Sequence, residues 1–146
     1  MQPIGEIDSI SHVIQLAVAP VFLLAGVGAM LNVLGNRLAR TVDRARFLET
    51  LHEAAAGAEQ ERLRQDLRLQ ARRARMIYWA MGLCALCALL VCAVIVVQFA
   101  NAFVHASFDV PVAVLFVAAL LAMIGALLLF LREVHLATTN LRIGPP

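Results

Sequence analysis

Two cysteines have a spacing that could support redox or metal chemistry. Cys84 and Cys87 form a CxxC pair, and Cys92 follows further along the same apolar run. Disulfide exchange or zinc binding at such a pair needs a polar, water-accessible site, and zinc needs further ligands as well. The neighbouring residues are leucine, alanine and valine. We therefore interpret the three cysteines as small packing residues and predict no redox or metal site here.

The histidines offer no second source of chemistry. His52, His105 and His135 are isolated from one another, and Glu133 and His135 point in different directions if this segment is a helix. No nucleophile lies at a suitable spacing from a base, and no phosphate-binding glycine loop is present. The sequence predicts neither an enzyme nor a bound cofactor.

One face of the first apolar segment collects polar side chains. At about 100° per residue this face is roughly 120° wide. Its candidate functional residues are His12, Gln15, Phe22 and Asn36, with Asn32 at the margin. One interpretation is a pore lined by the first helices of several copies, with Phe22 as its constriction. The other is a packing face whose polar ends reach the lipid headgroups, and the positions of these residues near the ends of the segment favour it.

A cluster of arginines follows this segment. Asp43 is one helical turn from Arg40 and from Arg46, and Arg44 lies beside it. These four residues are a candidate ion-pair network, although exposed helical pairs contribute only about 0.2–0.5 kcal/mol each. A solvated helix face is therefore the simpler interpretation of the cluster.

A second arginine cluster directly precedes another apolar run. Arg72, Arg73 and Arg75 are candidate contacts for anionic lipid headgroups, where each basic residue contributes about 1 kcal/mol. Trp79 follows them as a candidate interfacial anchor. Six acidic residues are interleaved with the arginines of residues 36–75, so we do not expect nucleic acid to be a partner.

Three apolar segments position these residues. They cover residues 12–34, 76–100 and 110–131 approximately, in a chain that is 62% hydrophobic with a mean hydropathy of +0.83. A soluble domain of this length cannot bury so much apolar surface, whereas each segment is long enough to span a bilayer. The sequence predicts an all-α integral membrane protein with three transmembrane helices and a C-terminal tail at 132–146.

The arginines predict the orientation of these helices. Ten of the twelve lie in residues 36–75, and basic loops stay in the cytoplasm, so we expect an outside N-terminus and a cytoplasmic C-terminus. Gly57 is the only glycine of that stretch, which contains no proline and carries apolar stripes on both sides of Gly57. A cytoplasmic helical hairpin that extends the first two membrane helices is therefore predicted. The hairpin has only a thin apolar core, and packing against hairpins of neighbouring subunits would stabilise it. This favours a homo-oligomer.

Small residues repeat at four-residue steps in the second and third apolar segments. They are Ala80, Cys84, Ala88 and Cys92 in the second, and Ala118, Ala122 and Ala126 in the third. Such ribbons let helices approach closely in lipid, so we expect these faces to pack.

The run from Ile10 to Arg46, and within it most specifically Ser11–Pro20 and Asn36–Arg46, resembles the signature of the bacterial DUF2721 family. These are small multi-span membrane proteins of unknown function. The resemblance implies a three-helix protein of the bacterial inner membrane and transfers no catalytic residue. The topology is also similar, more weakly, to proton-driven motor subunits of the TolQ/ExbB/MotA type. Their polar residues deep in the last two helices are missing here, because residues 76–98 and 110–131 contain no serine or threonine.

Two functional hypotheses follow. The first is a homo-oligomeric pore or channel lined by the first helix. The second is a non-conducting membrane scaffold that binds anionic lipid or a partner protein through the arginine-rich hairpin.

Overall fold

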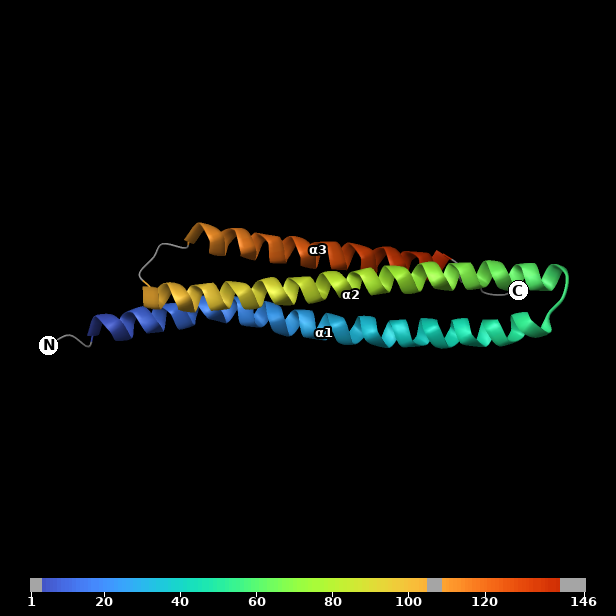
Figure 1. Ribbon diagram of the computed structural model, residues 1–146, viewed down its shortest axis with the longest axis horizontal. Helices are drawn as coiled ribbons and strands as arrows, with labels where there is room; N and C mark the ends of the chain where they lie inside the picture. Colours follow the sequence, from blue (N-terminus) through green and yellow to red (C-terminus); the bar gives the residue numbers. More distant parts are fainter. Residues whose placement is uncertain (1–3, 105–108, 140–146) are drawn as a thin grey trace. The chain divides into compact units, whose positions relative to one another are not determined.

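The computed structural model describes the backbone of residues 4–104 and 109–139, and side chains for residues 15, 18–101 and 109–137. Within these ranges the chain forms helix α1 (Ile4–Ala54), helix α2 (Ala58–Val104) and helix α3 (Asp109–Thr139) (Figure 1). The described part of the chain contains no strand, which confirms the all-α prediction there.

Each helix has a segment long and apolar enough to cross a membrane. These segments are Val18–Ala54, Ala58–Asn101 and Asp109–Ala137, and their most apolar windows have mean hydropathies of 2.0, 2.9 and 3.0. Only 17% of this window is buried within the chain in α1 and α3, and 28% in α2. The outward surface of these segments is therefore apolar too, as suits a membrane protein.

The chain divides into two compact units. The first contains α1 up to Met30, α2 from Leu83 and α3 up to Ile124. Its buried side chains are small, β-branched or proline: Pro20, Val27, Cys84, Cys87, Val91, Val94, Ala119 and Ala122. Cys84 and Cys87 are free thiols inside this core, as their apolar neighbours predict, whereas Cys92 is exposed.

The second unit contains α1 from Leu31, the connection to α2, α2 up to Gly82, and α3 from Gly125. Its apolar core is formed by Leu34, Leu48, Ile77, Ala80 and Ala126. Two polar side chains, Thr41 and Glu133, are buried with them. Towards the Gly57 turn, residues 41–49 and 64–74 of the two helical arms line an open cavity of about 530 Å³.

Buried positions follow a seven-residue period along the helices. On α1 they are Pro20, Val27, Leu34, Thr41 and Leu48, and on α2 they are Ile77, Ala80, Cys84, Cys87, Val91 and Val94. A strict four-residue ribbon drifts around a helix by about 40° per step, whereas alternating three- and four-residue steps stay on one side. This is why Ala80 and Cys84 are buried while Ala88 is only half-buried and Cys92 exposed. The period is typical of left-handed, coiled-coil-like packing.

Gly57 separates α1 from α2, as the sequence predicts. Its φ of 68° lies in the left-handed region, which glycine adopts without the cost that a Cβ imposes. Its carbonyl oxygen accepts a hydrogen bond from the Glu61 amide at 3.4 Å, the first turn of α2. The polar stretch is thus helical on both sides of Gly57, and its cytoplasmic location stays a prediction.

The third helix is longer than predicted. Residues 132–139, expected as part of the C-terminal tail, continue α3 to Thr139. No glycine or proline interrupts this segment, and the side chain of Glu133 is buried within it. The end of the apolar run at Leu131 is therefore not the end of the helix.

Replacing Gly57 with alanine tests the turn. A Cβ at this position meets no atom within 4 Å, so the cost comes from the left-handed backbone alone. We expect Gly57→Ala to lower the free energy of unfolding in detergent micelles by about 1 kcal/mol. Gly82→Ala is the control, because Gly82 is exposed within α2 and a helical glycine gains stability from this change. Equal effects of the two substitutions on the free energy of unfolding would contradict a left-handed backbone conformation at Gly57.

Candidate functional site

A buried glutamate is the most unusual feature of the described residues. Glu133 is 1% exposed and lies on the inward face of α3. Ala126 and Phe130 precede it on that face, at steps of four and three residues, and Ala137 follows four residues later. A helix with this pattern directs the Glu133 carboxylate towards the other two helices of the unit.

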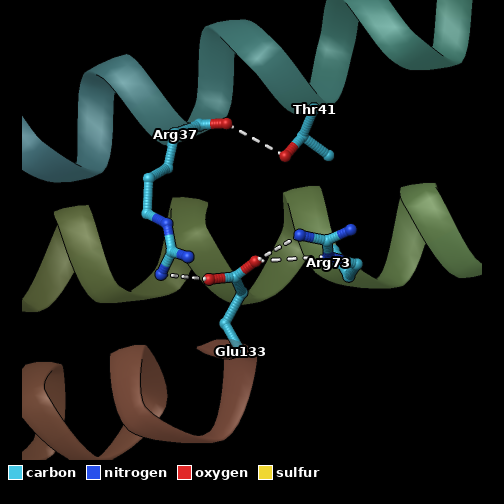
Figure 2. A network of polar contacts seen from close by, with 4 residues as sticks. All are labelled: Arg37, Thr41, Arg73 and Glu133. Carbon is cyan, nitrogen blue, oxygen red and sulfur yellow. Dashed lines mark hydrogen bonds and ion pairs between the residues drawn. The ribbon is translucent and has the colours of Figure 1, made fainter. Parts of the chain in front are cut away.

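Two arginines meet the carboxylate from different helices (Figure 2). Arg37 of α1 places its Nη1 2.9 Å from Oε2 of Glu133. Arg73 of α2 donates hydrogen bonds to Oε1 from Nη2 at 2.9 Å and from Nε at 3.2 Å. The Arg37 contact is an ion pair without hydrogen-bond geometry, since Oε2 accepts no hydrogen bond. One carboxylate therefore links α1, α2 and α3.

Neighbouring side chains hold Arg37 in place. Its Cζ atom lies 5.2 Å from the centre of the Phe130 ring, in a cation–π contact. One turn later, the buried Thr41 donates a hydrogen bond from Oγ1 to the Arg37 carbonyl oxygen at 2.9 Å. This contact satisfies a hydroxyl that would otherwise be buried without a partner.

The three charged residues lie at similar short distances from the ends of their apolar segments. Arg37 follows the first apolar segment by three residues, Arg73 precedes the second by three, and Glu133 follows the third by two. A charge taken out of water is tolerated only when it is paired and hydrogen-bonded. The network therefore marks the boundary between the apolar segments and the arginine-rich arms.

An open cavity of about 320 Å³ lies beside the network. Four arginines dominate its lining, and the complete set is Arg37, Arg40, Thr41, Arg44, Gln70, Arg73 and Glu133. Four guanidinium groups and one carboxylate give this lining a formal charge of +3. The cavity is thus strongly electropositive.

The predicted network around Asp43 is not formed. Arg40, Asp43, Arg44 and Arg46 are all exposed, and no ion pair joins Asp43 to any arginine among the described residues. Arg44 lies instead over the ring of Phe47, with its Cζ 5.5 Å from the ring centre. Water competes for exposed pairs of this kind, which leaves little free energy to hold them.

The predicted headgroup contacts divide into two groups. Arg72, Arg75 and Trp79 are exposed, and the Trp79 ring packs edge to face on Tyr78 with their centres 6.5 Å apart. Arg73 is instead turned inward to Glu133, where 26% of its side chain stays exposed. Consecutive positions on a helix face different directions, which explains why Arg72 and Arg73 separate.

The predicted polar face of α1 lies on the surface. Gln15, Phe22, Asn32 and Asn36 are exposed, and Phe22 is 73% exposed. Asn36 donates a hydrogen bond from Nδ2 to Oδ1 of Asn32 at 3.3 Å. His12 lies in the α1 backbone, but its side chain is outside the described residues. None of the four described residues lines the arginine cavity.

Metal chemistry finds no structural support in the described ranges. Within them, no group of three or more His, Cys, Asp or Glu side chains is arranged to hold a metal ion.

Sequence reasoning missed Glu133 as a site residue. A signal was available, because Glu133 is the only acid after Asp109 and directly follows an apolar segment. The predicted topology also places it at the same end of the helices as the arginines. Its partners could not be chosen from ten arginines by spacing alone.

A family model described as "Protein of unknown function (DUF2721)" matches residues 17–143. The chain belongs to the DUF2721 family. The match covers all residues of the Glu133 network and its cavity, and it confirms the resemblance noted in the sequence. No curated protein and no solved structure matches this DUF2721 chain.

Removing the Glu133 carboxylate tests the network. Glu133→Ala leaves Arg37 and Arg73 facing each other without a counter-charge. We expect a loss of about 2–3 kcal/mol in the free energy of unfolding in detergent micelles, reduced by the partial exposure of both arginines. Glu53→Ala makes the same chemical change at an exposed position of α1, and we expect it to change stability by less than about 0.5 kcal/mol. Similar losses in the two variants would contradict a structural role for the network.

Proposed function

We propose that this DUF2721 protein is a non-catalytic, three-span protein of the bacterial inner membrane that binds anionic lipid headgroups through its arginine-rich hairpin. The observation that carries the proposal is the sequence of side chains along the outer face of α2. Two exposed arginines, Arg72 and Arg75, precede the second apolar segment, and two exposed aromatic residues, Tyr78 and Trp79, lie in its first turn.

The exposed apolar side chains support membrane insertion. Phe22 on α1, Leu89 on α2 and Leu121 on α3 are 73%, 69% and 63% exposed. Soluble monomers rarely expose continuous apolar patches larger than a few hundred Å². Lipid tails would cover such surfaces on all three helices.

The distribution of arginine supports the orientation. The hairpin carries ten of the twelve arginines, and Arg132 and Arg142 follow the third apolar segment, so these parts belong on the cytoplasmic side, with the N-terminus outside. The cytoplasmic leaflet carries the anionic lipids that attract such segments.

Arg72 and Arg75 are best placed to meet this leaflet. They are three residues apart on α2, so they share a face, and both are exposed. Trp79 follows Arg72 by seven residues and so continues that face. Tyr78 and Trp79 are 67% and 61% exposed. Aromatic rings of this kind are enriched at the headgroup level of membranes.

Neutralising this pair tests the proposal. We expect Arg72→Gln with Arg75→Gln to weaken binding of phosphatidylglycerol in nanodiscs by about 30-fold, from roughly 1 kcal/mol for each arginine. The matched control is Arg62→Gln with Arg64→Gln, which removes the same charge about 18 Å or more from Met76 along α2, beyond two Debye lengths. Lipid retention measured by native mass spectrometry should be near wild type in the control. Equal losses of lipid binding in both variants would show that net charge alone explains the effect. That outcome would reject a specific headgroup contact at Arg72 and Arg75.

The exposed polar face of α1 favours a second candidate function. Gln15, Asn32 and Asn36 lie outside the core on a helix that is otherwise suited to lipid. Polar groups at membrane depth are costly and usually face protein or water. A homo-oligomer with α1 helices around a central path would give these side chains such surroundings, with the ring of Phe22 as a constriction.

A flux assay tests the pore. If Phe22 narrows a path, Phe22→Ala should increase ion or solute flux from liposomes severalfold over wild type. Leu89→Ala is the control, because Leu89 is similarly exposed but lies on α2. Absence of flux in wild type and in Phe22→Ala would reject the pore and leave the lipid-binding scaffold.

A further inference from the structure

The cavity beside Glu133 has more positive charge than its single carboxylate neutralises. Arg37 and Arg73 share Glu133, and Arg40 and Arg44 add two further guanidinium groups to the lining. Among the described residues, no ion pair joins Arg40 or Arg44 to an acid. Like charges gathered around one concavity repel each other unless an anion enters it.

The network presents donors as well as charge. A guanidinium group carries five N–H bonds, and Glu133 engages only part of those on Arg37 and Arg73. The Glu133 carboxylate holds both arginines, and the Phe130 ring also contacts Arg37, before any ligand arrives. Such preorganisation reduces the entropy that binding would otherwise cost.

Gln70 adds an unfulfilled polar atom to the same wall. Its Oε1 is buried and accepts no hydrogen bond. Buried polar atoms without a partner are uncommon in native proteins, so this oxygen is free to accept a hydrogen bond from a ligand. A phosphate that keeps one proton, such as HPO4²⁻ or a singly protonated phosphomonoester, would satisfy the atom with its P–OH group.

These observations select the chemical class of the ligand. We propose that the cavity formed by Arg37, Arg40, Arg44, Arg73 and Gln70 binds a phosphate dianion, either the phosphomonoester headgroup of a lipid or a free phosphate. A phosphomonoester carries a charge of about −1.5 to −2 at pH 7 and three strong acceptor oxygens, which matches several converging guanidinium groups. A phosphodiester carries one charge and presents fewer free oxygens. The volume of about 320 Å³ leaves room for the phosphate and for atoms attached to it.

The lipid source rests on the membrane placement proposed above. In that placement, Arg37, Arg73 and Glu133 lie two to three residues beyond their apolar segments, a rise of about 3–5 Å along a helix. The headgroup region extends roughly 5–8 Å beyond the hydrocarbon core on each side of a bilayer. A lipid phosphate would therefore reach the cavity, whereas a free phosphate needs no such placement.

Lipid selectivity provides the test for the first source. The full chain is reconstituted in nanodiscs with phosphatidic acid, a phosphomonoester, or with phosphatidylglycerol, a phosphodiester, in a zwitterionic background. Native mass spectrometry then measures how many molecules of each lipid are retained. We expect wild type to retain phosphatidic acid about tenfold better than phosphatidylglycerol.

The decisive variant is Arg40→Gln with Arg44→Gln. Both residues line the cavity but neither touches Glu133, so the ion pairs that link the helices stay intact. We expect it to lose the preference for phosphatidic acid. Arg62→Gln with Arg64→Gln removes the same charge from residues outside the cavity lining and should keep the preference.

Free phosphate is tested in detergent micelles without anionic lipid. Inorganic phosphate should raise the unfolding temperature of wild type and of the control more than sulfate does, and should not do so in Arg40→Gln with Arg44→Gln. A response in this arm without lipid selectivity assigns the cavity to a soluble phosphate.

The proposal is overturned if wild type shows neither lipid selectivity nor a phosphate response, or if the Arg40 and Arg44 variant matches the control in both arms. The lipid-binding function fails separately, because it requires that anionic lipids of both kinds are retained above the zwitterionic background. Equal retention of the two anionic lipids with no phosphate response keeps that function and removes the cavity site.

Discussion

A carboxylate with 1% exposure depends on the cations around it. Glu133 would be too costly to bury alone, and Arg37 and Arg73 would repel each other without it. Each helix of this unit supplies one member, so the three charges can be satisfied together only when α1, α2 and α3 are in one register. The apolar side chains around the network tolerate small shifts, but these contacts do not.

The position of Glu133 in the seven-residue pattern explains how one polar contact can set this register. Thr41 occupies the α1 seam between Leu34 and Leu48, and Glu133 follows Ala126 by seven residues on α3. Polar residues at seam positions of coiled coils select one alignment at some cost in stability. We interpret Glu133 in the same way, as a residue that specifies which faces of long and otherwise uniform helices meet.

The same network gives the protein its electropositive surface. Because Glu133 uses only part of the hydrogen-bonding capacity of two arginines, the remaining donors stay directed into the cavity that Arg40 and Arg44 complete. Arg72 and Arg75 add an outward arginine face on α2, next to exposed aromatic rings. Neighbouring positions of one helix thus supply both a buried ion pair, through Arg73, and an exposed arginine face, through Arg72 and Arg75.

The sequence by itself determined the helical class, three apolar segments of membrane-spanning length, and the break at Gly57. These features depend on local properties, namely helix propensity, the length of an apolar run and the backbone freedom of one glycine. It also indicated the burial of Cys84 and Cys87. Only the tertiary structure decided which charges pair. Arg73 and Glu133 are 60 residues apart in the chain, and Arg73 is of the same residue type as its exposed neighbour Arg72. Their contact depends on the rotation of each helix about its axis, which the packing of all three helices sets. For the same reason, sequence spacing offered a candidate network at Asp43, which forms no ion pair among the described residues, and missed the network around the buried carboxylate of Glu133.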